Sequence, residues 1–283
     1  MAESVEAIIT QAGIDRSRLL GIGIASPGPI DSALGTVVDP PLLEGWRNVH
    51  LRDALAEATG LPVVLEKDVN AAAVAELWTA GGDVRNDFAF FYLGTGIGVG
   101  LAFAGEVLRG STGNAGEGGT LVVPAEGLPE NRRSEMLGHL ATPQFLVRQA
   151  VDAGVLTTDP PVRDLAAIDD AFSELVRLAD AGDAGAAAIL DRAARLIASV
   201  LVSIVNLLDM DEIVFGGPAW ARVATRFHPI IDEIMSTSPD RKTTHTVRLH
   251  DSAVGEDVAA VGAACLVLDT ALAPRTSALL IGG

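Results

Sequence analysis

Short apolar segments of strand length alternate along this chain with longer segments whose apolar residues have helical spacing. Strand-like segments at 20–26, 61–65 and 212–215 are each followed by a turn signal or by a helical pattern. This alternation is typical of an α/β fold built on a mainly parallel sheet. Two adjacent apolar segments, 88–93 and 99–103, are joined by a glycine-rich turn and predict an antiparallel pair within that fold.

The rest of the chain is largely helical in pattern. Apolar spacing predicts helices at 3–12, 51–59, 68–80, 186–208, 220–235 and 258–272. The most apolar stretch, 196–208, is interrupted by three polar residues and predicts a buried helix, not a membrane span. Asp183 is expected to cap this helix. The pattern is weak from 128 to 164.

Charge and cysteine content disfavour several classes of function. The formal net charge of −17 is spread over 283 residues and would repel phosphate backbones, so the chain by itself is not expected to bind nucleic acid. The single cysteine, Cys265, excludes a disulfide framework and a cysteine-built zinc site. Its apolar neighbours predict a core thiol. The first ten residues do not have the pattern of a secretory signal, and a cytoplasmic protein is expected.

The segment LGTGIGVGL contains Gly94, Gly96 and Gly98. Because another strand-like segment follows it, and not a helix, the segment does not predict a dinucleotide site of the GxGxxG type. Two hypotheses remain. The backbone N–H groups and the Thr95 hydroxyl could bind a phosphate, or the glycines could serve only a tight hairpin that needs positive φ angles.

Two acidic residues lie where a ligand could bind. Asp68 follows the buried strand and begins a helix, which is where open α/β sheets place ligand groups. It could act as a general base toward a sugar hydroxyl, or it could simply cap the helix. Glu117, in the loop GNAGEGGTL, could accept hydrogen bonds from two neighbouring sugar hydroxyls, or it could be a solvated glutamate in a flexible loop.

The order and spacing of these motifs resemble the ROK family. ASPGPID, GW, LPVVLEKDVNAAAVAE, LGTGIGVGL, GNAGEGG and IVFGG follow one another from about Gly21 to the end of the chain. The family includes bacterial glucokinases and N-acetylsugar kinases, and also sugar-responsive transcriptional regulators of the NagC/XylR type. The resemblance implies an actin/hexokinase-like (ribonuclease H-like) ATPase fold with two lobes and a sugar cleft between them.

The resemblance also implies roles for particular residues. Asp68 matches the catalytic base, Glu117 matches a sugar-binding glutamate, and Glu135 is a candidate for the second sugar-binding glutamate. A phosphate- or nucleotide-binding role is implied for Gly94, Thr95, Gly96, Gly98, Gly216 and Gly217. A kinase of this family would need ATP and Mg²⁺.

The chain departs from the family pattern at several positions. Family kinases carry an Asp-x-Gly-x-Thr phosphate loop and strands upstream of the helix at 3–12, with which this chain begins. The histidine of the family's zinc motif is Thr120 here and no cysteine cluster follows, so no metal site is expected. The asparagine before the catalytic aspartate is Lys67, and another sugar-contact asparagine is Leu42. Lys67 would favour the ionised form of Asp68, which makes it a weaker base, and could attract an anionic sugar derivative.

Residues 1–87 are therefore expected to form an incomplete N-terminal lobe and residues 88–268 the C-terminal lobe, with a helix at about 269–283 packing on the first. The sequence favours an effector domain that senses a sugar or sugar phosphate in a ROK-type regulator with little or no kinase activity. The alternative is an ATP-dependent sugar kinase of the glucokinase or N-acetylhexosamine kinase type, and a third hypothesis is a degenerate structural or partner-binding remnant. A homodimer is expected, with no membrane contact and with DNA bound only through a segment outside this chain.

Overall fold

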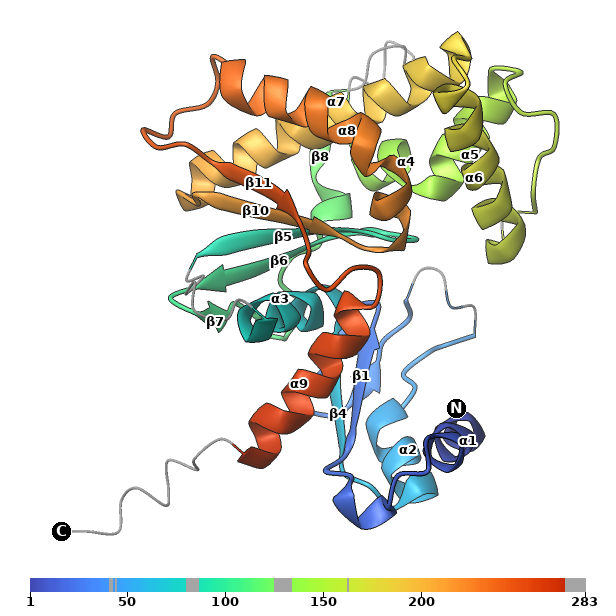
Figure 1. The fold of residues 1–283 in the computed structure, drawn as a ribbon, viewed down its shortest axis with the longest axis vertical. Helices are drawn as coiled ribbons and strands as arrows, with labels where there is room; N and C mark the ends of the chain where they lie inside the picture. Colours follow the sequence, from blue (N-terminus) through green and yellow to red (C-terminus); the bar gives the residue numbers. More distant parts are fainter. Residues whose placement is uncertain (41–42, 44, 80–86, 125–133, 162, 273–283) are drawn as a thin grey trace. The chain divides into compact units, whose positions relative to one another are not determined.

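The computed structural model describes residues 1–40, 43, 45–79, 87–124, 134–161 and 163–272 (Figure 1). The chain forms two compact units, one of residues 1–84, 107–115 and 257–283 and the other of residues 85–106 and 116–256. The single boundary expected at residue 87 differs from this division, because the segment 107–115 and the last helix make their contacts within the first unit. Residues 273–283 of the expected C-terminal helix, and Leu42, lie outside the described residues.

The first unit is built on two parallel strands whose register places Ile24 beside Leu65. Its elements are α1 (Ala2–Ala12), η1 (Arg16–Arg18), β1 (Ile22–Ser26), β2 (Ile30–Asp31), β3 (Thr36–Val37), α2 (Leu51–Thr59), β4 (Val63–Lys67), α3 (Asp68–Thr79) and α9 (Val258–Leu272). β1 pairs with β4, and β2 pairs with β3. Helices α1 and α2 both end at a glycine in the left-handed conformation, Gly13 and Gly60. The helices predicted at 3–12, 51–59 and 258–272 are thus confirmed.

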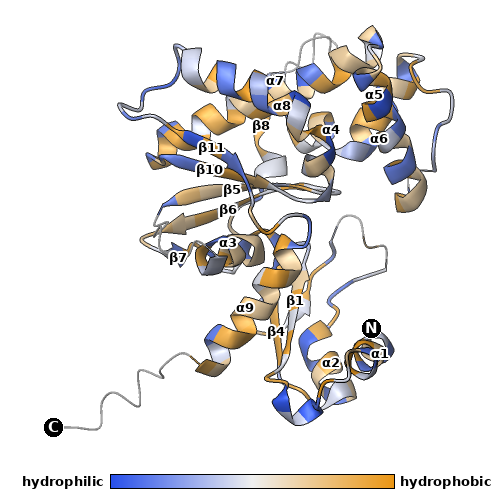
Figure 2. Ribbon diagram, viewed as in Figure 1, coloured by the Kyte–Doolittle hydropathy of each residue, from blue (hydrophilic) through white to orange (hydrophobic). Residues whose placement is uncertain are grey.

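Small residues allow α9 to pack closely against α3 and β1. A Cβ atom on Gly262 would overlap the carbonyl oxygen of Ala71, and one on Gly23 would overlap the carbonyl oxygen of Ala263. Helix α9 is mostly hydrophobic along its length (Figure 2). Although α9 is far from α3 along the chain, it therefore packs directly against the helix that begins with Asp68.

The second unit contains a five-stranded sheet in the order β11-β10-β5-β6-β7. The strands are β5 (Phe88–Leu93), β6 (Ile97–Phe103), β7 (Glu106–Val107), β10 (Glu212–Gly216) and β11 (Arg248–Asp251). β10 is parallel to both β5 and β11, whereas β5 and β6 form the antiparallel pair that the glycine-rich turn predicts. A separate hairpin joins β8 (Val122–Pro124) to β9 (Ser134–Met136) after the short η2 (Gly118–Thr120).

Helices cover this sheet on the side drawn uppermost in Figure 1. They are α4 (Gly138–Ala141), α5 (Pro143–Asp152), α6 (Leu165–Asp180), α7 (Ala184–Leu208) and α8 (Pro218–Thr237). Asp183 caps α7 by accepting a hydrogen bond from the N–H of Ala186 at 2.8 Å, as predicted. Helix α5 lies in the region where the sequence pattern is weak, and α6 was not predicted, although it buries an apolar stripe that includes Phe172 and Leu175. Within the described residues, no helix combines the length and the hydropathy needed to cross a bilayer.

Candidate functional site

Asp68 is the first residue of α3 and directly follows β4, at the carboxyl end of a parallel strand. Its side chain is half-buried, and its Oδ1 accepts a hydrogen bond from the N–H of Val69 at 2.8 Å. This contact fits a residue that begins a helix, and the role of Asp68 as a ligand-binding carboxylate stays a prediction. Both roles, helix capping and ligand binding, depend on the position of Asp68 between β4 and α3.

Lys67 is buried, with 3% of its surface exposed. Its Nζ donates to the carbonyl oxygen of Ala115 at 3.0 Å and to that of Asn114 at 3.4 Å. The ammonium group therefore fastens the end of the 107–115 segment to the corner between β4 and α3. Attraction of an anionic ligand by Lys67 remains a prediction.

Glu66, which the sequence analysis did not single out, connects the same two segments. It is 6% exposed, and its Oε2 accepts a hydrogen bond from Nε of Arg109 at 2.6 Å. Its Oε1 accepts one from Nδ2 of Asn70 at 3.0 Å, and Asn70 also donates to the carbonyl oxygen of Gly113 at 3.3 Å. A buried carboxylate needs such partners, because transfer of an unpaired charge from water is very costly. The sequence signal that could have indicated this role is a glutamate at the end of an otherwise apolar strand.

The 107–115 segment is also tied to β2, the short strand that comes after β1. The side chain of Asn114 accepts a hydrogen bond from the N–H of Ile30 at 2.8 Å and donates to the carbonyl oxygen of Ile30 at 2.7 Å. The amide thus satisfies both backbone groups of one residue, as a neighbouring strand would. Together with Glu66 and Lys67, this contact makes a polar network around the residue that precedes α3.

Glu117 belongs to the second unit, and its side chain is exposed. It follows Gly116, whose φ of 86° and close packing against the carbonyl of Val99 both require glycine. The Glu117 carbonyl accepts hydrogen bonds from the N–H and hydroxyl of Thr120 at 3.1 and 2.7 Å, which closes η2. These two bonds close the turn after Glu117, and both hypotheses for its side chain, sugar binding and a solvated glutamate, stay predictions.

Glu135 lies on β9, in register with Val123 of β8, which follows the Glu117 loop. Its Oε1 is 3.0 Å from Nδ1 of His139 and accepts a hydrogen bond from the N–H of Met136 at 2.9 Å. No group of three or more histidine, cysteine, aspartate or glutamate side chains with a metal-binding arrangement occurs in the described parts of the chain. A role for Glu135 in sugar binding stays a prediction.

The turn between β5 and β6 contains Gly94, Thr95 and Gly96, and the N–H of Gly94 donates to the carbonyl oxygen of Gly96 at 3.0 Å. Neither glycine has a positive φ, so the hypothesis that the turn needs glycine for its conformation is wrong at these two positions. A Cβ atom on Gly96 would meet nothing within 4 Å. The chain's own conformation and packing therefore give no reason for glycine at 96. Gly98 lies within β6, paired with Tyr92.

The second glycine motif has a different explanation. Gly217 has a φ of 103°, and a Cβ atom there would come within 2.5 Å of the carbonyl oxygen of Leu93. A Cβ atom on Gly216 would come within 2.6 Å of the Phe90 ring. Backbone conformation and packing therefore suffice to explain both glycines, and their contact with a nucleotide stays a prediction.

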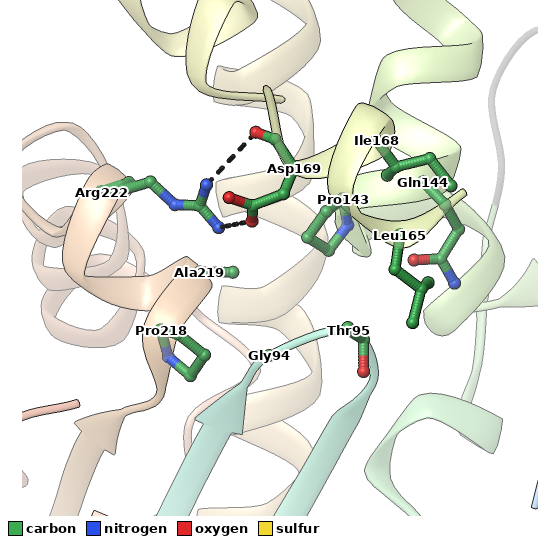
Figure 3. A pocket seen from close by; sticks show the side chains of 10 residues that line it. All are labelled: Gly94, Thr95, Pro143, Gln144, Leu165, Ile168, Asp169, Pro218, Ala219 and Arg222. Atoms are coloured by element: carbon green, nitrogen blue, oxygen red, sulfur yellow. Dashed lines mark hydrogen bonds and ion pairs between the residues drawn. The ribbon is translucent and has the colours of Figure 1, made fainter. Parts of the chain in front are cut away.

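A pocket in the second unit brings the two glycine motifs together (Figure 3). Gly94 and Thr95 form one wall, and Pro218 and Ala219, which follow Gly217 at the start of α8, form another. The remaining lining residues come from the starts of α5 and α6 and from α8: Pro143, Gln144, Leu165, Ile168, Asp169 and Arg222. Neither α5 nor α8 has a side-chain cap at its first residue. Uncapped helix starts present backbone N–H groups, to which anions bind.

The chain is similar in sequence both to sugar kinases and to transcriptional repressors. The sequence profile described as "ROK family" matches residues 1–136 and 162–270. A glucokinase of Halalkalibacterium halodurans is 29% identical over 275 residues, which cover 94% of this chain and 82% of that protein. A xylose repressor of Caldicellulosiruptor bescii is 35% identical over 115 residues, 41% of this chain and 29% of the repressor.

Among solved structures, a ROK family glucokinase from Streptomyces griseus, determined in complex with glucose and AMPPNP, superposes with a TM-score of 0.73. The two are 26% identical, and the match covers 94% of this chain and 86% of that one. The similarity therefore extends over both units, including the segments that carry Asp68, Glu117 and the glycine motifs.

Proposed function

Because this chain belongs to the ROK family, whose members include sugar kinases and sugar-responsive regulators, we propose that it binds a sugar or sugar derivative through Asp68 and Glu117. We place it with the regulators, as an effector domain with little or no kinase activity. Carboxylates that accept hydrogen bonds from hydroxyl groups can bind a sugar without transferring a proton. The proposal thus needs these two side chains as hydrogen-bond acceptors and does not need a strong base.

The observation that favours sensing over catalysis is the position of Lys67. It directly precedes Asp68, is buried, and has its ammonium group held by the carbonyl oxygens of Asn114 and Ala115. In the kinases of the family an asparagine that contacts the sugar stands at this position, whereas here the ammonium group is held by the chain's own backbone. A sugar-contact side chain of the kinases is therefore replaced next to Asp68, and this departure favours sensing over catalysis.

Sugar binding is tested by thermal unfolding in the presence of glucose, xylose, N-acetylglucosamine, N-acetylmannosamine and their phosphates. A ligand that binds only the folded chain stabilises it by RT ln(1 + [L]/Kd), so the Tm rises with the logarithm of the ligand concentration once that concentration exceeds Kd. The shift should disappear in Asp68→Asn and in Glu117→Gln. Glu57→Gln, an exposed glutamate on α2, is the matched control and should keep the shift. A panel in which no sugar stabilises the chain would sink the proposal.

A second candidate function, an ATP-dependent sugar kinase, is favoured by the second unit. Gly96 has no conformational or packing reason to be glycine, which fits a turn that a phosphate approaches closely. The pocket beside it is bounded by two uncapped helix starts. In this function Asp68 would accept the proton of a sugar hydroxyl as its oxygen bonds to the γ-phosphorus, while ADP departs and Mg²⁺ balances the phosphate charges.

The two functions differ in one measurable product. Each sugar that raises the Tm is incubated with ATP and Mg²⁺, and ADP formation is followed by a coupled assay. A sensing domain forms no sugar-dependent ADP. Sugar-dependent ADP formation that falls at least about 100-fold in Asp68→Asn would establish the kinase and overturn the sensing proposal.

A further inference from the structure

The pocket of the second unit is crossed by an ion pair between two helices. Nη2 of Arg222, on α8, lies 2.7 Å from Oδ1 of Asp169, on α6 (Figure 3). Nη1 of Arg222 also donates to Oγ of Ser173 at 3.0 Å, and the guanidinium lies 4.8 Å from the centre of the Phe172 ring. A single side chain of α8 therefore contacts three residues in the second and third turns of α6.

The pocket is too small for a nucleoside. Its volume is about 50 Å³, whereas one water molecule needs roughly 10–15 Å³ on the same measure and small-molecule sites have volumes of about 300 Å³ or more. The space holds a few water molecules. These walls could enclose a nucleoside only if one of them moved.

The walls differ in how they are held. Thr95 lies in the turn between β5 and β6, and Pro218 directly follows β10, so the sheet fixes both positions. The opposite wall consists of Leu165 and Ile168 on α6, which belongs to no sheet. Displacement of this wall would break no strand pairing, and Asp169 is the next residue along it.

We propose that the Arg222–Asp169 ion pair is a latch that keeps a nucleotide pocket closed by holding the start of α6 against α8. The proposal rests on the kinase-type nucleotide site described above and adds the device that controls access to it. In the closed state Nε of Arg222 is buried with no protein acceptor. A buried donor without a partner has lost its hydrogen bonds to water, which raises the free energy of the closed state. The free-energy difference between the closed and open states is therefore expected to be small.

The first experiment measures opening without any nucleotide. In a Cys265→Ala background, the substitution Ile168→Cys puts a thiol on the buried side of the pocket, and its reaction with Ellman's reagent reports how often the wall opens. Asp169→Asn should speed this reaction about two- to fivefold, the range expected for a partly exposed ion pair. Glu174→Gln is the matched control, because Glu174 pairs with Arg177 on the same helix and not with α8. An unchanged rate in Asp169→Asn, with unchanged circular dichroism, overturns the latch.

The second experiment measures ATP binding by titration calorimetry. The apparent Kd for ATP equals the Kd of the open state divided by the fraction of molecules that are open. Asp169→Asn and Arg222→Met should therefore lower the apparent Kd by about the factor by which they speed thiol labelling, and Glu174→Gln should leave it unchanged. Faster thiol labelling without ATP binding in any form would overturn the assignment of the pocket to a nucleotide. ATP binding that neither latch variant alters would overturn the latch and leave the kinase-type function standing.

Discussion

The ammonium nitrogen of Lys67 lies 3.0 Å from the carbonyl oxygen of Ala115, so the residue before Asp68 holds the last residue of the 107–115 segment in place. The sequence marks Lys67 as a departure from the family pattern, and the structure shows what its side chain contacts. A buried lysine whose donors are taken up by backbone carbonyls contributes to the fold as well as to the charge of the site. Stability and ligand binding at this corner are therefore linked.

Lys67→Met should lower the free energy of unfolding by about 1–3 kcal/mol, because the carbonyl oxygens of Asn114 and Ala115 lose a donor in a buried place. Urea unfolding followed by circular dichroism measures the change. The other lysine of the chain, Lys242, provides the control, since it donates to the carbonyl oxygen of Pro239 from an exposed position. Lys242→Met should stay within about 0.5 kcal/mol of the parent. Equal effects of the two substitutions would contradict this account.

Glu66→Ala should destabilise the chain by about 2 kcal/mol or more, because Arg109 and Asn70 both lose their acceptor. Glu106→Ala, at an exposed glutamate, is the control. A double-mutant cycle with Glu66→Gln and Arg109→Met should give a coupling energy of about 0.5–3 kcal/mol. A coupling energy near zero would mean that the ion pair does not stabilise this corner.

The two glycine motifs should respond differently to alanine. Gly217→Ala should cost about 2 kcal/mol or more, because its φ of 103° is strained for an L-residue and the new Cβ would press on the Leu93 carbonyl. Gly96→Ala should keep the free energy of unfolding within about 1 kcal/mol of the parent value, because Gly96 has neither a positive φ nor a close neighbour at the Cβ position. If the turn binds phosphate, Gly96→Ala should instead weaken ATP binding in calorimetry. A Gly96→Ala variant that unfolds readily would refute this distinction.

Burial raises the pKa of the Cys265 thiol, and the nearby charge of Asp269 raises it further. The folded chain should therefore react with iodoacetamide at pH 8 much more slowly than the chain in urea, where the pKa is about 8.5. Because the folded-state pKa is the higher one, its stabilising contribution is complete below the unfolded pKa and is lost as the pH rises through the folded pKa. Cys265→Ala should lack this alkaline loss of stability, as urea titrations between pH 8 and 10 would show.

Much of the fold follows from local pattern. The helix at 258–272 and the strand at 88–93 have the bounds that apolar spacing predicts, and Asp183 caps α7 as expected. These features depend on the spacing of side chains along one element, which the sequence contains directly. Helix α6 was missed, although its apolar stripe is regular, because three prolines and many polar residues before it obscured where a helix would begin.

The sequence by itself determined the α/β class, the position of Asp68 between a strand and a helix, and the hairpin that contains Gly94 and Gly96. Only the tertiary structure showed that Glu66 and Lys67 hold the 107–115 segment, and that Arg222 pairs with Asp169 across a pocket. The physical reason is distance along the chain. These partners are separated by more than 40 residues, and which charged side chains meet is decided by the packing of helices and strands between them, not by any local pattern.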